Sequence, residues 1–319
     1  MKEIKITKTQ AGTRLDRLLK RYLSKAPSGF IYKMLRKKNI KVNGSKAAGD
    51  LVLNEGDVIN IYLSDETVEK FGSESKTAPA VNVPEPEIVY EDDNIVIINK
   101  PAGVLSQRDR SGAYSVNDQL IAHLRRTGEV NDESLEIFAP SIVNRLDRNT
   151  SGIVLCGKTH DALKALSEMM RERTAGKYYK CVVSGVLSAE GRLRGYLVKD
   201  ERTNRVSVSP KEAQGGSYIE TVYRPIETWG DYTLMEVELV TGKSHQIRAH
   251  LSSIGHPLVG DNKYGGKRLP PIKRQALHAY KISFPRMQGE FSYLSGRSFE
   301  AILPKDFKEL TKYLVSIRG

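Results

Sequence analysis

The loop at residues 144–152 carries the side chains best suited to covalent chemistry. Asp147 lies at its centre with Arg145 and Arg148 beside it, and a turn-favouring stretch follows at residues 149–152. Nearby cations favour the charged form of a carboxylate, so we expect Asp147 to be ionised at neutral pH and able to act as a nucleophile or a base. A solvated ion pair on a loop is the alternative interpretation, because structural ion pairs also perturb carboxylates.

The segments on either side of this loop are predicted to be strands. Residues 142–143 are Ile-Val and residues 153–155 are Ile-Val-Leu. Short runs of β-branched residues are typical of buried sheet. We therefore expect a sheet to hold the Asp147 carboxylate in place.

The order Arg-Leu-Asp-Arg-Asn-Thr-Ser-Gly at residues 145–152 resembles the signature loop of the RluA-type pseudouridine synthases, which isomerise uridine in ribosomal and transfer RNA. Three further stretches resemble motifs of that family in the family's order: residues 100–105, 177–185 and 242–261. The similarity extends over residues 88–303. Four motifs in one order make a chance match improbable, and they imply an enzyme that isomerises uridine.

The resemblance implies catalytic roles for Asp147, Tyr179 and Arg248. Asp147 matches the family's catalytic aspartate, and Arg248 matches the arginine that pairs with it. Tyr179 matches a tyrosine whose ring could stack on the uracil and whose hydroxyl could accept the carbon-5 proton. Alternatively, Tyr179 is a core residue of a strand and Arg248 a surface clamp for phosphate. Tyr178 should point to the opposite face.

A second set of residues is expected to contact RNA around the reacting uridine. Arg145 matches the arginine that fills the space vacated by the flipped base. Asn144 stands where the family usually has His, and an Asn side chain can hydrogen-bond but cannot carry a proton. The remaining members of this loop set are Arg148, Thr150 and Ser151.

Charge is distributed unevenly along the chain, which has a formal net charge of +12. Residues 1–64 contain 14 Lys or Arg against 5 Asp or Glu, whereas residues 65–94 contain 2 against 9. Clustered Lys and Arg bind phosphates by releasing counterions. The sequence therefore predicts an RNA partner, bound partly by a compact basic N-terminal unit.

This N-terminal unit is predicted to contain two helices followed by a hairpin. The helices start near residues 14 and 28, with Thr13 and Ser28 as possible N-caps, and strands cover residues 40–42 and 58–63. The unit resembles the small RNA-binding domain named after a small-subunit ribosomal protein. A solubilising surface is the alternative for its basic face, which we expect to grip phosphates. That face consists of Lys33, Arg36, Lys37, Lys38 and Lys41.

We predict three parts: a small α/β RNA-binding domain at residues 1–64, an acidic, proline-containing linker at 65–87, and a catalytic domain at 88–319. The catalytic domain should be α+β with a mixed, mainly antiparallel sheet. Its predicted elements include a hairpin at residues 87–100, a helix at 115–126 capped by Ser115, helices at 160–173 and 305–316, and a helix starting near Ser244. Strands are predicted from residue 178 onward.

Several classes of protein are disfavoured by composition. The chain lacks an apolar run of membrane-spanning length and a signal peptide, so we expect a cytoplasmic protein without a membrane partner. Cys156 and Cys181 lie in apolar runs and should be buried, reduced thiols. His245 and His250 lack zinc-helix spacing, so no metal or other cofactor is expected. Nothing in the sequence argues for more than a monomer.

The resemblance therefore implies isomerisation of uridine in large-subunit (23S) ribosomal RNA of bacteria. Relatives with the extra N-terminal unit suggest the ribosomal target, and a transfer-RNA-directed enzyme is an alternative. A second alternative is a non-catalytic ribosome assembly factor, which the presence of Asp147, Tyr179 and Arg248 disfavours. An RNA glycosidase is least favoured, because it would normally need two acidic groups and the motifs supply one.

Overall fold

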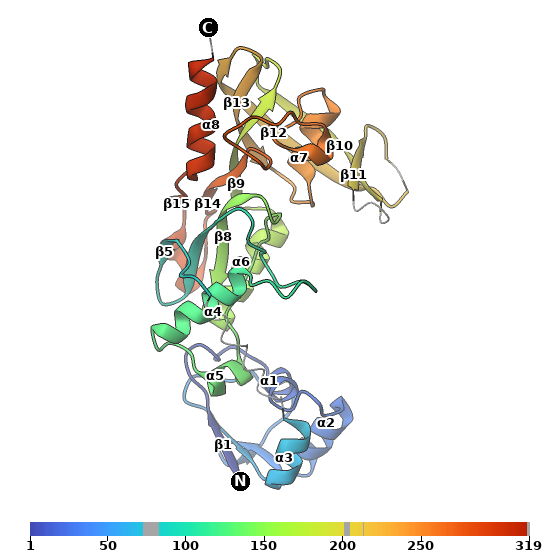
Figure 1. Ribbon diagram of the computed structural model, residues 1–319. Coiled ribbons are helices and arrows are strands. Elements are labelled where there is room, and N and C mark those ends of the chain that lie inside the picture. Colours follow the sequence, from blue (N-terminus) through green and yellow to red (C-terminus); the bar gives the residue numbers. More distant parts are fainter. Residues whose placement is uncertain (73–82, 201–204, 213, 318–319) are drawn as a thin grey trace.

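The computed structural model describes residues 1–72, 83–200, 205–212 and 214–317. The molecule is elongated: the N-terminal elements lie at one end and the C-terminal helix α8 (Lys305–Ser316) lies at the other (Figure 1). None of the helices in these ranges is long and apolar enough to span a bilayer. Cys156 and Cys181 are free and buried, as predicted.

The N-terminal end is a small antiparallel sheet packed against two helices. Its strands, in the order β1-β4-β2-β3, are β1 (Lys2–Lys5), β4 (Val58–Ile61), β2 (Ile40–Val42) and β3 (Ser45–Lys46). The helices are α1 (Leu15–Tyr22) and α2 (Ser28–Arg36). The expected caps are wrong: Arg14 and Pro27 occupy the N-cap positions, Ser28 is already helical, and the buried Thr13 hydroxyl has no partner among the described residues.

The start of the predicted linker forms a helix that the sequence analysis did not anticipate. Helix α3 (Asp65–Phe71) follows Ser64, whose side chain accepts a hydrogen bond from the Thr67 amide. Acidic residues in the first helical turn suit the positive end of the helix dipole. The middle of the linker, residues 73–82, lies outside the described residues, so the three-part division of the chain stays a prediction.

The rest of the chain is built on one large sheet in the order β11-β10-β12-β13-β9-β14-β8-β6-β5. Among the strands that the structure describes, only β8 and β14 pair in parallel, so the α+β class with a mixed, mainly antiparallel sheet is confirmed. Strands β7 and β15 pair at its side with β8 and β14. The strands are β5 (Ile88–Glu91), β6 (Ile95–Lys100), β7 (Ser141–Ile142), β8 (Ser151–Gly157), β9 (Gly176–Ser184), β10 (Gly191–Asp200), β11 (Arg205–Ser209), β12 (Ser217–Trp229), β13 (Tyr232–Leu239), β14 (Leu277–Ser283) and β15 (Ser298–Glu300).

Helices cover both faces of this sheet. On one face, α4 (Val116–Arg126) and α7 (Gln246–Ser253) pack into the largest apolar core. On the other face, α6 (His160–Glu172) and α8 each cover a separate cluster. Helix α4 begins with the predicted Ser115 cap, where a reciprocal bond to Asp118 forms a capping box.

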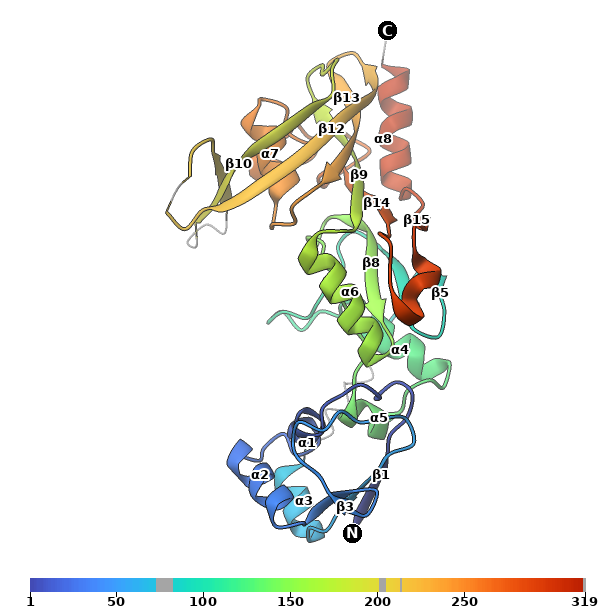
Figure 2. The same cartoon turned by 180° about the vertical axis from the view of Figure 1, so that it is seen from behind.

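The two ends of the molecule are joined through a short helix, α5 (Asp132–Ile137). The Ile137 side chain belongs to the apolar core of the N-terminal unit. Arg21 of α1 donates to the Leu135 carbonyl, and the His160 amide donates to the Thr9 carbonyl. Helix α2, the loop after β6 and the β10–β11 hairpin all project from the same side of the molecule (Figures 1 and 2).

Candidate active site

A pocket of about 800 Å³ opens beside the predicted catalytic loop. Its walls come from the loop after β6, the loop at residues 143–150, the C-terminal part of α6, strand β9 and the segment leading into α7. These segments are far apart in the sequence and meet where β8 and β14 pair. The three residues expected to act in catalysis, Asp147, Tyr179 and Arg248, all line this pocket.

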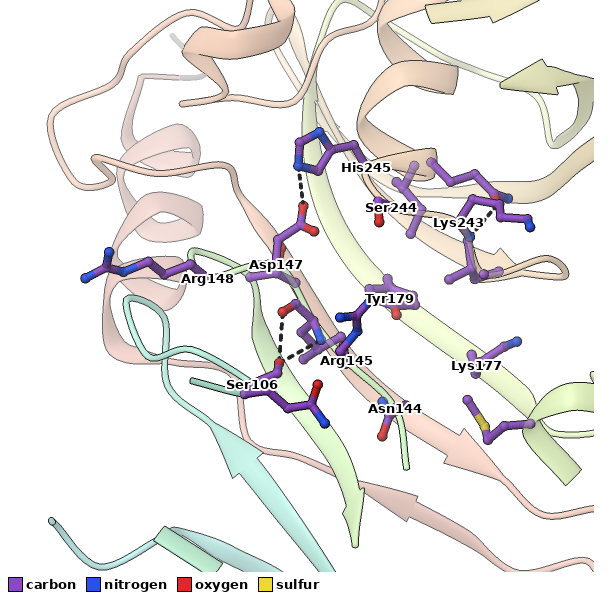
Figure 3. A pocket seen from close by; sticks show the side chains of 18 of the residues that line it. Ser106, Asn144, Arg145, Asp147, Arg148, Lys177, Tyr179, Lys243, Ser244 and His245 are labelled. Atoms are coloured by element: carbon purple, nitrogen blue, oxygen red, sulfur yellow. Dashed lines mark hydrogen bonds and ion pairs between the residues drawn. The ribbon is translucent and has the colours of Figure 1, made fainter. Parts of the chain in front are cut away.

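The loop that carries Asp147 is tied to the loop after β6. Buried Lys100 donates to the carbonyls of Pro101, Val104 and Arg148, at 2.9, 2.7 and 3.0 Å. The Ser106 hydroxyl donates to the Leu146 carbonyl and accepts from the Leu146 amide (Figure 3). Burial lowers the pKa of Lys100 to about 7, but the three acceptors favour its ammonium form, which alone has three donors.

Asp147 itself is held at one carboxylate oxygen. Oδ2 accepts from Nη1 of Arg248 at 2.9 Å and lies 3.6 Å from Nε2 of His245. Oδ1 makes no hydrogen bond with any residue that the structure describes. The side chain is 25% exposed, so it combines a fixed position with access from the pocket.

Arg248 is fixed from its other side by a carboxylate that sequence reasoning missed. Asp261, almost fully buried, accepts from Nε and Nη2 of Arg248 at 2.7 and 2.8 Å. The guanidinium also lies 5.0 Å from the centre of the Tyr264 ring. Burial lowers the pKa of Arg248, but hydrogen bonds and charge from Asp261 and Asp147 outweigh that effect and raise it overall. The predicted Asp147–Arg248 pair is therefore present, braced by Asp261.

His245 completes this cluster at the start of α7. The residue has a left-handed backbone (φ 56°) and is the N-cap of the helix, one residue after the predicted start. Its Nδ1 is 2.9 Å from the Tyr264 hydroxyl, and its Nε2 faces Asp147 (Figure 3). Burial lowers the pKa of His245, which favours the neutral imidazole.

Tyr179 and Tyr178 point to opposite faces of β9, as the strand pattern predicted. Tyr179 is 8% exposed and belongs to both the large core and the pocket wall. It is therefore a core residue of the strand and is also placed to contact a bound base. Burial, with a smaller contribution from the charge of Asp147, raises its pKa. Tyr178 lies outside the pocket and has the Lys281 ammonium 5.4 Å from its ring centre.

The residues of the loop set differ in how available they are. Arg145 is exposed at the pocket and, among the described residues, makes no hydrogen bond or ion pair; its side chain extends towards Tyr179 in Figure 3. Arg148 is exposed and donates through Nε to the Gly103 carbonyl. Thr150 is 2% exposed and its hydroxyl accepts from Gln275.

The other two members of that set, Ser151 and Asn144, also have partners within the protein. Ser151 lies inside β8 and is 1% exposed, and its hydroxyl is 2.9 Å from Nδ1 of His278. In this position the Ser151 side chain cannot reach RNA, so the predicted contact is wrong. The Asn144 amide donates to the Ile153 carbonyl and accepts from the Leu155 amide. Asn144 therefore anchors the catalytic loop to β8.

The basic residues predicted at the N-terminus lie on α2 and immediately after it. Lys33, Arg36, Lys37 and Lys38 are exposed, and none makes an ion pair with a described residue. Lys41 is half-buried, with its ammonium 5.4 Å from the centre of the Tyr62 ring. Four of the five cations are therefore exposed on α2 and in the turn after it, whereas Lys41 lies within β2.

Asp261 and Lys100 are the important residues near the site that sequence reasoning did not assign. Both lie within stretches that resembled family motifs, residues 242–261 and 100–105. Their place inside these motifs could have marked Asp261 and Lys100 as candidates. Their bonding partners are remote in sequence, so the sequence alone did not indicate what they do. In the described ranges, no group of three or more His, Cys, Asp or Glu is arranged to hold a metal ion.

Comparisons with known proteins show the family to which the chain belongs. A family model described as RNA pseudouridylate synthase matches residues 94–253. Ribosomal large subunit pseudouridine synthase C of Vibrio cholerae is 34% identical over 290 residues, 88% of either chain. Ribosomal large subunit pseudouridine synthase D of Neisseria meningitidis is 34% identical over 73% of this chain and 63% of its own.

A solved structure, Human RNA Pseudouridylate Synthase Domain Containing 4, has the same fold. It superposes with a TM-score of 0.57 over 72% of this chain and 92% of its own, at 20% identity. The family model spans half of the chain, and the Vibrio cholerae relative aligns with most of it. The chain belongs to the RNA pseudouridylate synthase family.

Proposed function

We propose that this isomerase converts uridine to pseudouridine in large-subunit (23S) ribosomal RNA of bacteria. The observation that carries the proposal is the Asp147 carboxylate, held through Oδ2 by Arg248 with Oδ1 left without a protein donor among the described residues. A carboxylate with one oxygen fixed and the other available suits attack on, or deprotonation of, a bound nucleotide.

The reaction breaks the bond between ribose and ring nitrogen 1, rotates the uracil and rejoins it through carbon 5, which then loses its proton. Asp147 attacks or deprotonates the sugar or base while Arg248 holds the carboxylate in position. The buried ring of Tyr179 lines the pocket and supports the uracil. Its raised pKa keeps the hydroxyl protonated, so the proton released from carbon 5 passes to water. No step requires a cofactor.

Arg145 is proposed to occupy the space that the flipped uridine leaves in the RNA. Its exposed guanidinium has no partner among the described residues, so it is free to stack or to bind a base. Arg148 and Thr150 line the same pocket and are proposed to contact the nucleotides beside the target. Asn144 supports the loop from behind through its bonds to β8.

The ribosomal target is supported by the relatives and by the N-terminal unit. The similar proteins of Vibrio cholerae and Neisseria meningitidis are named for the ribosomal large subunit. Helix α2, the loop after β6 and strands β10 and β11 project from one side of the molecule (Figures 1 and 2). We propose that a folded RNA binds along this side. Such a substrate also supports a cytoplasmic location, and a single copy of the chain supplies every residue proposed here.

The basic face of the N-terminal unit is proposed to bind RNA phosphates. Replacing Lys33, Arg36, Lys37 and Lys38 together by Gln should weaken binding to ribosomal RNA and lower the slope of log affinity against log salt by about 3, because up to four counterion-releasing contacts are lost. Filter binding across a salt series measures both quantities. An unchanged slope would remove this face from the RNA interface.

The proposed reaction is tested with RNA tritiated at uridine carbon 5. The wild-type protein should release tritium from 23S ribosomal RNA transcripts or immature large-subunit particles, and much less from 16S or transfer RNA. Release from transfer RNA alone would favour the transfer-RNA-directed alternative. RNA binding without release from any substrate would overturn isomerisation and support the assembly-factor alternative.

A further inference from the structure

Besides Arg145, the pocket has cations without a side-chain partner among the described residues where α6 is followed by β9. Lys177 at the start of β9 and Arg173 just after α6 both line the pocket, and neither makes a hydrogen bond or an ion pair through its side chain with a described residue. Arg171, on the same helix end, differs because it pairs with Glu168 and Glu172. Lys177 is half-buried, so water compensates its charge only in part.

The surroundings of Lys177 disfavour its charged form when the pocket holds no anion. Burial lowers the pKa of the Lys177 ammonium, and the nearby charge of Arg173 lowers it further, while Glu238 has a smaller opposite effect. Two like charges facing one pocket would both be stabilised by a bound anion. A phosphate diester is the anion that an RNA substrate supplies.

The backbone supports the same interpretation. Arg173 is the C-cap of α6 and has a left-handed conformation, φ 60°, which glycine adopts far more readily. An arginine at this position places a cation at the pocket despite the backbone strain.

The position of Lys177 relative to Tyr179 indicates which phosphate. The two residues are two apart on β9, so their side chains lie on the same face, about 7 Å apart along the strand. In Figure 3, Lys177 lies beyond Tyr179 as seen from Asp147. A uracil on Tyr179 would therefore leave Lys177 about one nucleotide away from the reacting atoms.

We propose that Lys177 and Arg173 bind a backbone phosphate of the RNA strand next to the reacting uridine. The inference rests on the proposed function, which places the uracil on Tyr179. The contact positions the strand that enters the pocket and adds affinity without touching the bonds that break. Lys177 and Arg173 are thus positioning residues.

The test compares Lys177→Gln, Arg173→Gln and the double variant with the wild type, using the full chain and a 23S transcript. Loss of one phosphate contact should weaken binding about fivefold at 0.1 M salt and lower the slope of log affinity against log salt by about 0.7, the value for single strands. The maximal rate at saturating RNA should stay within about twofold. Lys177→Arg keeps the charge and should restore affinity.

Lys164→Gln is the matched control. Lys164 is exposed on α6 and does not line the pocket, so this variant loses the same charge and should keep the wild-type slope. A neutral methylphosphonate linkage beside the reacting uridine should cost the wild type about fivefold in affinity and cost Lys177→Gln almost nothing more. Additive losses from linkage and variant would overturn the proposal.

The two proposals fail separately. Tritium release by the wild type, with the salt slope unchanged in the double variant, would reject the phosphate site and keep the isomerase. A lowered slope without tritium release from any RNA would keep the site and reject the reaction. If the slope of log affinity against log salt fell equally in Lys164→Gln, the effect would come from net charge alone, and the phosphate site would also be rejected.

Discussion

Asp147→Asn should lower tritium release from 23S transcripts by at least about 10³-fold at saturating RNA. The amide is nearly isosteric with the carboxylate but is neither a nucleophile nor a base of useful strength. Arg248 would keep its two bonds to Asp261, so the pocket should retain its shape. The loss should therefore be in the maximal rate, measured by single-turnover tritium release.

Asp109→Asn is the control for this variant. Asp109 also lines the pocket, but its carboxylate bonds within its own loop, to Ser111, and is remote from Arg248. It should keep nearly the wild-type rate, and both variants should bind RNA with similar affinity. More than about a tenth of the wild-type rate in Asp147→Asn would contradict the assignment of the reacting carboxylate.

Asp261→Asn should be the second most damaging change, through its effect on Arg248. Removing one partner of a buried ion pair typically costs about 3 kcal/mol, because the remaining charge loses its compensation. Asp261 is 2% exposed and Arg248 is 7% exposed, so water cannot replace the lost carboxylate. Arg248 would also lose the contact that orients Nη1 towards Asp147, and a small misplacement can lower the rate about 100-fold.

Both effects are measurable on the same preparations. Urea unfolding gives the loss of stability, and single-turnover tritium release well below the unfolding midpoint gives the rate of folded enzyme. Asp306→Asn is the control, because Asp306, in the first turn of α8, accepts two hydrogen bonds from Arg274 at 2.7 and 2.8 Å and is 36% exposed. It should lose stability with little change in rate. Equal rates for the Asp261 and Asp306 variants would show that Arg248 does not need Asp261 to orient Asp147.

Local sequence determined the main elements of this protein and the position of its candidate catalytic loop. A continuous apolar run predicted β6, the alternation of apolar residues predicted β12 and β13, and the Ser115 cap predicted the start of α4. Such features depend on neighbouring residues, so they can be inferred from spacing and residue type. The family motifs added the pairing of Asp147 with Arg248, which spacing alone does not indicate.

Tertiary structure decided which side chains serve the site and which serve the fold. Ser151 and Asn144 look like ligands in the loop, yet their polar groups bond to His278 and to the backbone of β8. Asp261 and Lys100 become important only because folding brings them to Arg248 and to the carbonyl of Arg148. Polar groups that become buried must find partners, and the chain path, not local sequence, determines which partners lie within reach.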